Sequence, residues 1–293
     1  MKGKYLIFLL AVTLPLAGCR DRFFYIDVAA SDAVYAGIRA QWDTLSDEAS
    51  RSACLLQMGR PVCDIAIWYG EDSLANASAC PVEIPYGFNA SPIETDELLH
   101  HAHVRHGLLV TDNCRTYKAL YLAEPAETLS LDLLRALASF ADQGAVIGGV
   151  KPVAPADSSD AESFLRLVEK TWSTGNAISG KTLESVLRAV GAIPDMKTKV
   201  DSLAFAHRHL PDADIYRIVN PTSATVKKAK IRFRVSGRQP FRYDPDTGNV
   251  TPVSYKIKKG RTRITLPLYP YETVFIVFGP YADRRKMKVK PLS

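Results

Sequence analysis

The chain has 293 residues, of which 47% are hydrophobic and 23% are charged, proportions that are ordinary for a globular protein with one or two cores. The formal net charge of +6 falls to +4 without Lys2 and Lys4. Basic residues gather in 227–230, 256–263 and 284–290, a pattern that could attract anionic glycans or nucleic acid. Because no aromatic residues are interleaved with them, we expect no nucleic-acid partner and interpret these segments as solvated strand faces and a polar tail.

Residues 1–19 have the features of a targeting segment. Lys2 and Lys4 form a charged start, residues 5–14 are apolar, and the sequence Leu16-Ala17-Gly18-Cys19 is typical of a lipobox. The apolar run is too short to remain as a membrane-spanning helix. We therefore predict an exported bacterial lipoprotein whose lipidated Cys19 anchors a soluble remainder to a cell-envelope membrane, with an ordinary cleaved signal peptide as the alternative.

Four further cysteines follow the leader, at Cys54, Cys63, Cys80 and Cys114. An even number in an exported protein permits two disulfides, which could be paired in three ways. Their spacing matches no CxxC metal pattern, and four buried free thiols are an equally consistent alternative because free cysteine behaves as a small apolar residue.

The N-terminal third changes from helical to strand patterning. Residues 21–59 are predicted to be helical because Val34, Ile38, Trp42 and Leu45 recur at helical spacing, and Gly59-Arg60-Pro61 ends the helical segment. Residues 62–69 (VCDIAIWY) form a nearly continuous apolar run, which predicts a buried strand. A helix is expected over 94–104 and a short strand over 108–110.

The middle of the chain predicts a layered α/β domain over residues 61–200. A strand at 118–122 precedes a helix that begins after Ser130 and ends before Gly144, and a strand at 145–150 follows. The predicted apolar stripe of this helix is Leu131, Leu134, Ala138 and Ala141. Strand, helix and strand in this order indicate a βαβ unit and a parallel sheet, here of the flavodoxin-like class, with further helices at 160–170 and 181–190.

Residues 201–280 predict an all-β domain, followed by a polar tail at 281–293. In the strand near 231 the apolar side chains Ile231, Phe233 and Val235 alternate with Lys230, Arg232 and Arg234. Turns are expected at 211–212 and 244–248, a hairpin at 254–266, and a central strand at 273–278. Together these strands predict a β-sandwich.

Short motifs in both predicted domains give the chain a resemblance to the large α-L-rhamnosidases. In the C-terminal part they are His207-Arg208, residues 212–216, Val219-Asn220, Tyr243-Asp244-Pro245 and Thr247-Gly248. Upstream they are residues 55–62 (LLQMGRPV), Asp64-Ile65, residues 69–72 (YGED), residues 85–89 (PYGFN), Leu98-Leu99 and Tyr117. Their order and spacing, over about residues 52–278, resemble the region after the catalytic barrel of that family.

This resemblance implies a glycoside hydrolase whose barrel precedes accessory domains. A (β/α)₈ barrel takes about 250 residues, but only residues 20–59 separate Cys19 from Arg60. We therefore expect 20–60 to be a helical barrel remnant, with no positions that match the catalytic glutamates of the family, and enzymatic activity stays uncertain. The resemblance also implies calcium in the catalytic domain, although we identify no cofactor or metal site in this chain, and a partner chain could carry the barrel.

Four residues are candidates for facing carbohydrate. Glu71 and Asp72 follow the first predicted strand, where ligands of α/β sheets bind, although they could equally belong to a capped turn. His207 and Arg208 precede a tight turn and could face sugar hydroxyls or a neighbouring domain. The structural alternative pairs Arg208 with an acid of the turn region, either Asp212 or Asp214. Tyr216, Tyr243, Tyr269 and Tyr271 could stack on sugars but fit the core and edges of a sandwich better.

Two other motifs are interpreted as structural. Residues 175–182 (GNAISGKT) satisfy the P-loop pattern, but they follow a helical segment instead of the required strand, which disfavours nucleotide binding. His100, His101, His103 and His106 lie close together, yet they have neither the order nor the cysteine of a zinc site, so we expect a solvated helix face. The sequence thus predicts a role in glycan degradation, with a non-catalytic carbohydrate-binding or structural envelope lipoprotein as the alternative.

Overall fold

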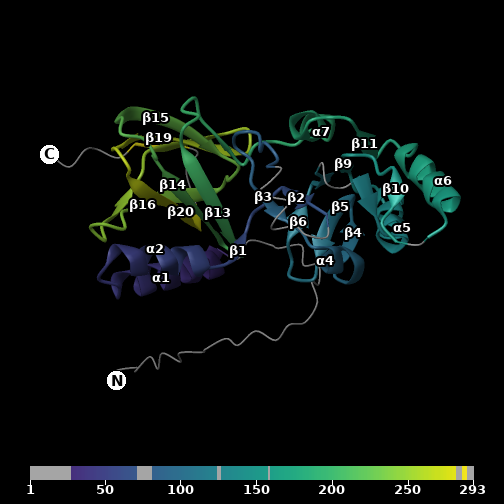
Figure 1. Cartoon of the computed structure of the whole chain (residues 1–293). Coiled ribbons are helices and arrows are strands. Elements are labelled where there is room, and N and C mark those ends of the chain that lie inside the picture. Colours follow the sequence, from purple (N-terminus) through teal and green to yellow (C-terminus); the bar gives the residue numbers. More distant parts are fainter. Residues whose placement is uncertain (1–27, 71–80, 124–126, 158, 282–285, 289–293) are drawn as a thin grey trace, which may run out of the picture.

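The computed structural model describes residues 28–70, 81–123, 127–157, 159–281 and 286–288. The chain forms two bodies side by side, an α/β layer domain and a β-sandwich that carries two helices (Figure 1). Cys19, Glu71, Asp72 and Cys80 lie outside the described residues. Within the described part of the chain, no helix is long and apolar enough to cross a bilayer.

The layer domain is built on a five-stranded sheet in which every pair of neighbours is parallel. The spatial order is β3 (Ala90–Pro92), β2 (Ile65–Trp68), β7 (Ala119–Leu122), β9 (Ile147–Gly149) and β11 (Ala177–Ser179). All four residues of β2 are buried, as its apolar sequence predicted. The helices are α4 (Thr95–His100), α5 (Leu131–Asp142), α6 (Ala161–Trp172) and α7 (Leu183–Ala189). Short strands β8 (Thr128–Leu129) and β10 (Ala154–Pro155) pair beside the sheet.

The predicted βαβ unit is confirmed, with α5 joining β7 to β9. The Ser130 side chain caps α5 by accepting a hydrogen bond from the Leu133 amide, and Gly144 follows the helix with a positive φ of 93°. The predicted stripe needs correction, because Leu133, Leu137 and Phe140 are buried with Leu134 and Ala141, whereas Leu131 and Ala138 are half-buried. The helix touches both the sheet and α6, so its buried face is wider than one stripe.

The helix predicted over 94–104 is too long. It ends at His100, and β4 (Ala102–Arg105) then pairs with β5 (Leu108–Thr111), which pairs with β6 (Thr116–Tyr117). His106 and Gly107 both have positive φ, the geometry of a two-residue hairpin turn. His103 therefore lies on a strand and His106 in a turn, and the two do not share a helix face.

The second body contains two antiparallel sheets that pack face to face as the predicted β-sandwich, and three of their strands come from outside residues 201–280. One has the order β1 (Arg60–Pro61), β13 (Ala204–Leu210), β14 (Ala213–Val219), β20 (Thr273–Tyr281), β16 (Arg238–Tyr243) and β17 (Val250–Pro252). The other has the order β12 (Met196–Lys197), β15 (Val226–Phe233), β19 (Arg261–Leu268), β18 (Tyr255–Lys258) and β21 (Lys286–Met287). Their shared core includes Tyr216, Phe233, Ile264 and Phe278.

Local features of the sandwich follow the predicted pattern. In β15, Ile231 and Phe233 are buried while Lys230 and Arg232 are exposed. The hairpin between β18 and β19 turns through Lys259 and Gly260, both at positive φ, as a type I′ turn requires. Strand β20 is central in its sheet and buried from Val274 to Phe278.

Two N-terminal helices, α1 (Val28–Asp43) and α2 (Glu48–Gln57), cover the second face of the six-stranded sheet (Figure 1). Trp42 and Leu55 are buried there against Ile215 and Phe275. The Trp42 indole also donates to the carbonyl of Gly248, 2.9 Å away, in the turn between β16 and β17. The helical prediction for residues 21–59 is confirmed in its described part, and the helices form a third layer of the sandwich body.

The cysteines match neither of the predicted alternatives. Cys54 and Cys63 are free thiols and half-buried. Cys114 is disulfide-bonded. The prediction of two disulfides and the alternative of four free thiols are therefore both wrong.

Candidate functional site

A cleft of about 400 Å³ lies where the six-stranded sheet meets the layer domain. Strand β1 pairs antiparallel with β13 at this edge, so residues 60–63 lead directly from the sandwich into the parallel sheet. The described residues that line the cleft are Arg60, Pro61, Val62, Cys63, Cys114, Thr116, His207, His209, Asp214, Arg234, Val235, Ser236 and Arg238. Polar groups from distant parts of the sequence therefore converge on one concavity, which makes it the candidate binding site.

The centre of the cleft is formed by one hairpin. In the register of β13 and β14, His207 lies opposite Tyr216 and His209 lies opposite Asp214. Because strand side chains alternate, the two histidines share one face. Asp214 Oδ1 lies 3.0 Å from His207 Nε2 and 2.8 Å from His209 Nδ1. The strand period thus places a carboxylate between two imidazoles.

His207 is held on both sides by buried carboxylates. Its Nδ1 atom lies 2.8 Å from Asp195 Oδ2, and its ring stacks on Tyr216 at a centroid distance of 4.0 Å. The Tyr216 hydroxyl donates to the other oxygen of Asp195, at 2.9 Å. Burial alone lowers the pKa of His207, but the hydrogen bonds to Asp195 and Asp214 outweigh burial and raise the pKa to about 8. His207 is therefore charged at neutral pH.

Asp214 is the complementary anion. Burial raises the pKa of Asp214, but hydrogen bonds from His207 and His209 outweigh burial and hold the pKa well below its usual range. The Arg238 side chain approaches from β16, with Nε 3.8 Å from Asp214 Oδ2. Both carboxylate oxygens of Asp214 therefore face cations.

A second group of charges joins the cleft to the layer domain. Arg234 Nη2 lies 2.9 Å from Asp64 Oδ1 and 3.4 Å from Asp195 Oδ1. Lys118 Nζ lies 2.8 Å from the same oxygen of Asp64. Asp64 is 5% and Asp195 is 1% exposed, so these ion pairs are shielded from water. Arg234 thus connects Asp64, which precedes β2, with Asp195, which precedes β12.

The described lining residues of the cleft include a single carboxylate. Glycoside hydrolysis needs two carboxyl groups that flank the scissile bond. Asp214 is the one carboxylate among the described residues that line the cleft, and both its oxygens already face cations. Both ring nitrogens of His207 are also occupied, so the imidazole has no free lone pair for a general base. The exposed groups can orient a polar ligand.

The two described site candidates, His207 and Arg208, lie on opposite faces of β13. His207 lies in the cleft, whereas Arg208 points to the opposite face of β13, as strand alternation requires. Arg208 donates to the carbonyls of Met58 at 2.9 Å and Gly59 at 2.8 Å, beyond the end of α2. The alternative that pairs Arg208 with Asp212 or Asp214 is wrong, because those acids face Arg238.

Replacing Arg208 by methionine is expected to lower the free energy of unfolding by about 1 kcal/mol, because the carbonyls of residues 57–59 lose charged donors. Urea unfolding measures the change. Arg39→Met is the matched control, since its ion pair with Asp43 is exposed and is worth about 0.3–0.5 kcal/mol. Equal effects in the two variants would contradict a capping role for Arg208.

The tyrosines also divide into two groups. Tyr216 and Tyr243 are fully buried, which confirms their core assignment. Tyr269 and Tyr271 are exposed in the turn between β19 and β20, away from the residues that line the cleft. The four rings therefore form no common stacking surface.

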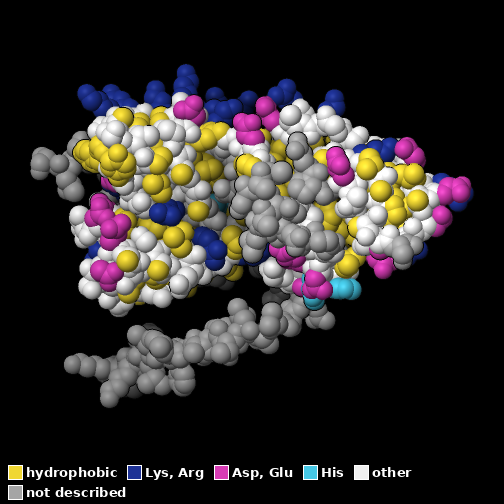
Figure 2. All heavy atoms as spheres, viewed as in Figure 1, with side chains coloured by type: hydrophobic (Ala, Val, Ile, Leu, Met, Phe, Trp, Pro, Cys, Tyr) yellow, Lys and Arg dark blue, Asp and Glu magenta, His cyan; other side chains and the backbone are white. Residues whose placement is uncertain are grey.

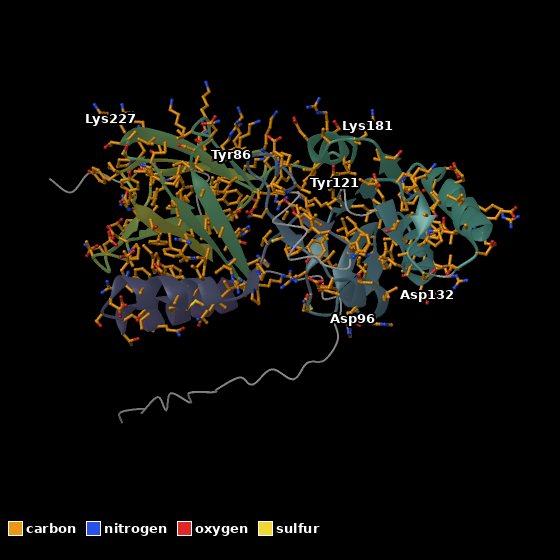
Figure 3. All side chains as sticks on the ribbon, in the orientation of Figure 1. Tyr86, Asp96, Tyr121, Asp132, Lys181 and Lys227 are labelled. Atoms are coloured by element: carbon orange, nitrogen blue, oxygen red, sulfur yellow. The ribbon has the colours of Figure 1, made fainter. Side chains whose placement is uncertain are left out.

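Residues 175–182, which match the P-loop pattern, form part of the connection between α6 and α7. Helix α6 precedes it and β11 lies inside it, so no strand leads into the glycine-rich segment. Thr182 caps α7 by accepting from the Ser185 amide, and Lys181 lies beside this helix in the layer domain (Figure 3). This arrangement agrees with the interpretation of the motif as a loop before an ordinary helix.

The histidine-rich segment shows no metal-like geometry. His101 Nδ1 lies 2.9 Å from Asp112, at the surface. Across the described residues, no group of three or more His, Cys, Asp or Glu side chains could hold a metal ion.

Comparison with known proteins identifies the family. A family model described as alpha-L-rhamnosidase, glycoside hydrolase family 106, matches residues 39–257, and the chain belongs to this family. The structure of a rhamnosidase from Novosphingobium sp. PP1Y superposes with a TM-score of 0.78 at 30% identity, over 84% of this chain and 25% of that one. A protein of Formosa agariphila named "Putative beta-glucuronidase" is 28% identical over 248 residues, which are 81% of this chain and 21% of that protein. The chain therefore spans about a quarter or less of either relative.

The sequence did not reveal most of the cleft. Asp195, Arg234 and Asp64 were not singled out as a group, because they are far apart in the sequence. Asp195 lies 12 residues before His207, Arg234 lies 27 residues after it, and Asp64 lies 143 residues before it. The one available signal was the pair of histidines at 207 and 209 with Asp214 five residues later, which the hairpin register brings together.

Proposed function

We propose that this chain is an exported lipoprotein, anchored through Cys19, that takes part in glycan degradation as the accessory part of a rhamnosidase-type hydrolase. Membership of the α-L-rhamnosidase family supports a carbohydrate ligand. The observation that carries the proposal is the charged cleft, which has ligand-orienting groups but lacks a second lining carboxylate among the described residues. A partner chain would then supply the catalytic barrel.

The proposal also includes a fold class for the layer domain and an origin for the N-terminal helices. We assign residues 61–200 to the flavodoxin-like class, because the parallel strands, numbered in chain order, stand in the spatial order 2-1-3-4-5. Ligands of such sheets bind outside the carboxyl ends of the strands. Glu71 and Asp72 follow β2 in the sequence and remain candidates for contacting glycan there. We assign residues 20–60 to the remnant of a barrel.

The test is hydrolysis of aryl α-L-rhamnoside and aryl β-D-glucuronide by the purified full chain in detergent, with and without calcium. We expect no turnover by the folded protein alone. We also expect binding of rhamnose-containing oligosaccharides that weakens in His209→Ala, because His209 lines the cleft and its side chain is 35% exposed. Turnover that Glu71→Gln abolishes would contradict the assignment of catalysis to another chain. Unchanged binding in His209→Ala would remove the cleft from the proposal.

A further inference from the structure

The outer face of the five-stranded sheet of the sandwich carries a row of basic residues that crosses the strands. In the strand register, Lys197 on β12 lies opposite Arg232 on β15, Arg232 opposite Arg263 on β19, and Arg263 opposite Lys256 on β18. All four side chains are exposed. Lys and Arg side chains gather along this edge of the sandwich, over β15 and β19 (Figure 2), and Lys227 lies at its end (Figure 3).

This row is unfavourable for folding. Like charges directly opposite each other on neighbouring strands destabilise a sheet. Within the described part of the chain, no salt bridge joins these four residues to an acid. A hollow of about 490 Å³ on this face is lined by Ile193 and by six basic residues, Arg232, Lys256, Lys258, Lys259, Arg261 and Arg263, with no aspartate or glutamate among its described lining residues. An external anion in the hollow would relieve this repulsion.

We propose that this face binds a linear polyanionic glycan that lies across the strands and bears carboxylate or sulfate groups. Neighbouring strands are about 4.8 Å apart, so the charges of the row repeat at an interval similar to the length of one sugar unit in an extended polysaccharide. A glycan with one negative charge per sugar can therefore place successive charges against successive strands. The choice of a glycan rests on the proposed function, whereas the anionic character rests on the row itself.

Other anionic macromolecules fit this surface less well. Proteins that bind single-stranded nucleic acid place aromatic rings under the bases, and none of the described residues lining the hollow is aromatic. Helices that lie on membranes insert a broad apolar face, and here Ile193 is the single apolar residue of the described lining. The surface offers charges without an apolar or stacking platform, which suits a hydrophilic polyanion.

The test uses the triple variant R232Q/R263Q/K256Q and a polymannuronate oligomer long enough to cross five strands. Calorimetry at low salt is expected to show binding by the parent chain and a loss of about tenfold in affinity in the triple variant. Binding by the parent should weaken as salt rises and be absent with the same oligomer after its carboxylates are reduced to alcohols. The melting temperature of the triple variant should equal or exceed that of the parent, because like-charge repulsion is removed.

The matched control is R135Q/R166Q/R188Q, which removes the same number of charges from exposed residues of α5, α6 and α7, each paired with an acid one turn away. We expect this variant to bind the oligomer as the parent does. Equal losses in the two triple variants, or no binding by the parent, would overturn the proposal. Tighter binding to anionic vesicles or to single-stranded DNA at the same salt would overturn it in favour of that partner. Hydrolysis of a rhamnoside by the chain alone would refute the proposed function but leave this binding result unaffected.

Discussion

Replacing His207 by glutamine is expected to lower the free energy of unfolding by about 3–5 kcal/mol at pH 6, because removal of one partner from a buried ion pair leaves the other charges uncompensated. Here two carboxylates, Asp195 and Asp214, would lose the imidazolium between them. His207 is 7% exposed, so water cannot take its place easily. Urea unfolding at pH 6 measures the loss.

The same residue gives the protein a pH-dependent stability. The pKa of His207 is raised from 6.5 to about 8 in the folded state, so its contribution is fully present below about pH 6.5 and is lost as the pH rises through 8. The difference corresponds to about 2 kcal/mol. The pKa of Asp214 is lowered, so its contribution is present above about pH 4 and is lost as the pH falls further. Stability from this pair is therefore greatest between about pH 4 and 6.5.

Urea unfolding from pH 5.5 to 9 tests the assignment. The parent should lose stability on the alkaline side, and His207→Gln should show no such loss. His101→Gln is the control, because His101 also faces a carboxylate, that of Asp112, but lies at the surface. A parent-like alkaline loss in His207→Gln would show that another group titrates there.

The outcome for Arg234 shows what periodicity can and cannot predict. The alternation in β15 correctly placed Lys230 and Arg232 outside and Ile231 and Phe233 inside. It also placed Arg234 outside, but β15 ends at Phe233, and the next side chain reaches Asp64 of the layer domain, 170 residues away in sequence. A period of two identifies the face of a strand, but it contains no information about which distant segment covers that face.

The same limit explains why the sequence did not predict the partners of His207 in the candidate site. The βαβ unit and the hairpin at 259–260 depend on neighbouring residues, so local rules predicted them. The partners of His207 depend on how three segments meet, and of these only the β13–β14 register is local. Arg208 was grouped with His207 because the two are adjacent, yet adjacency in a strand places them on opposite faces.

Replacing Arg234 by methionine is the second change with a large expected effect. It keeps most of the aliphatic stem but leaves Asp64 and Asp195 without the guanidinium that joins them, and we expect a loss of about 3–5 kcal/mol in the free energy of unfolding. Asp64 then keeps its ion pair with Lys118, but its second oxygen Oδ2 is buried without a hydrogen-bond partner, so Lys118 alone would not replace what Arg234 supplies. Urea unfolding at pH 7 measures the effect.

Arg232→Met is the matched control for this prediction, because Arg232 lies two residues earlier, is exposed, and should change stability by less than about 0.5 kcal/mol. Adding Asp64→Asn to each variant completes the design. Asp64→Asn should lower the free energy of unfolding much less in the Arg234→Met background than in the parent chain, because the two residues interact directly. The two losses should differ by about 0.5–3 kcal/mol. Additive losses would mean that Arg234 does not hold the two bodies together through Asp64. Arg232 lies on the open face of the sheet, so Arg232→Met should weaken binding of the polyanionic glycan with little change in stability. Arg234 is paired with Asp64 of the layer domain, so the main effect of Arg234→Met should be on stability.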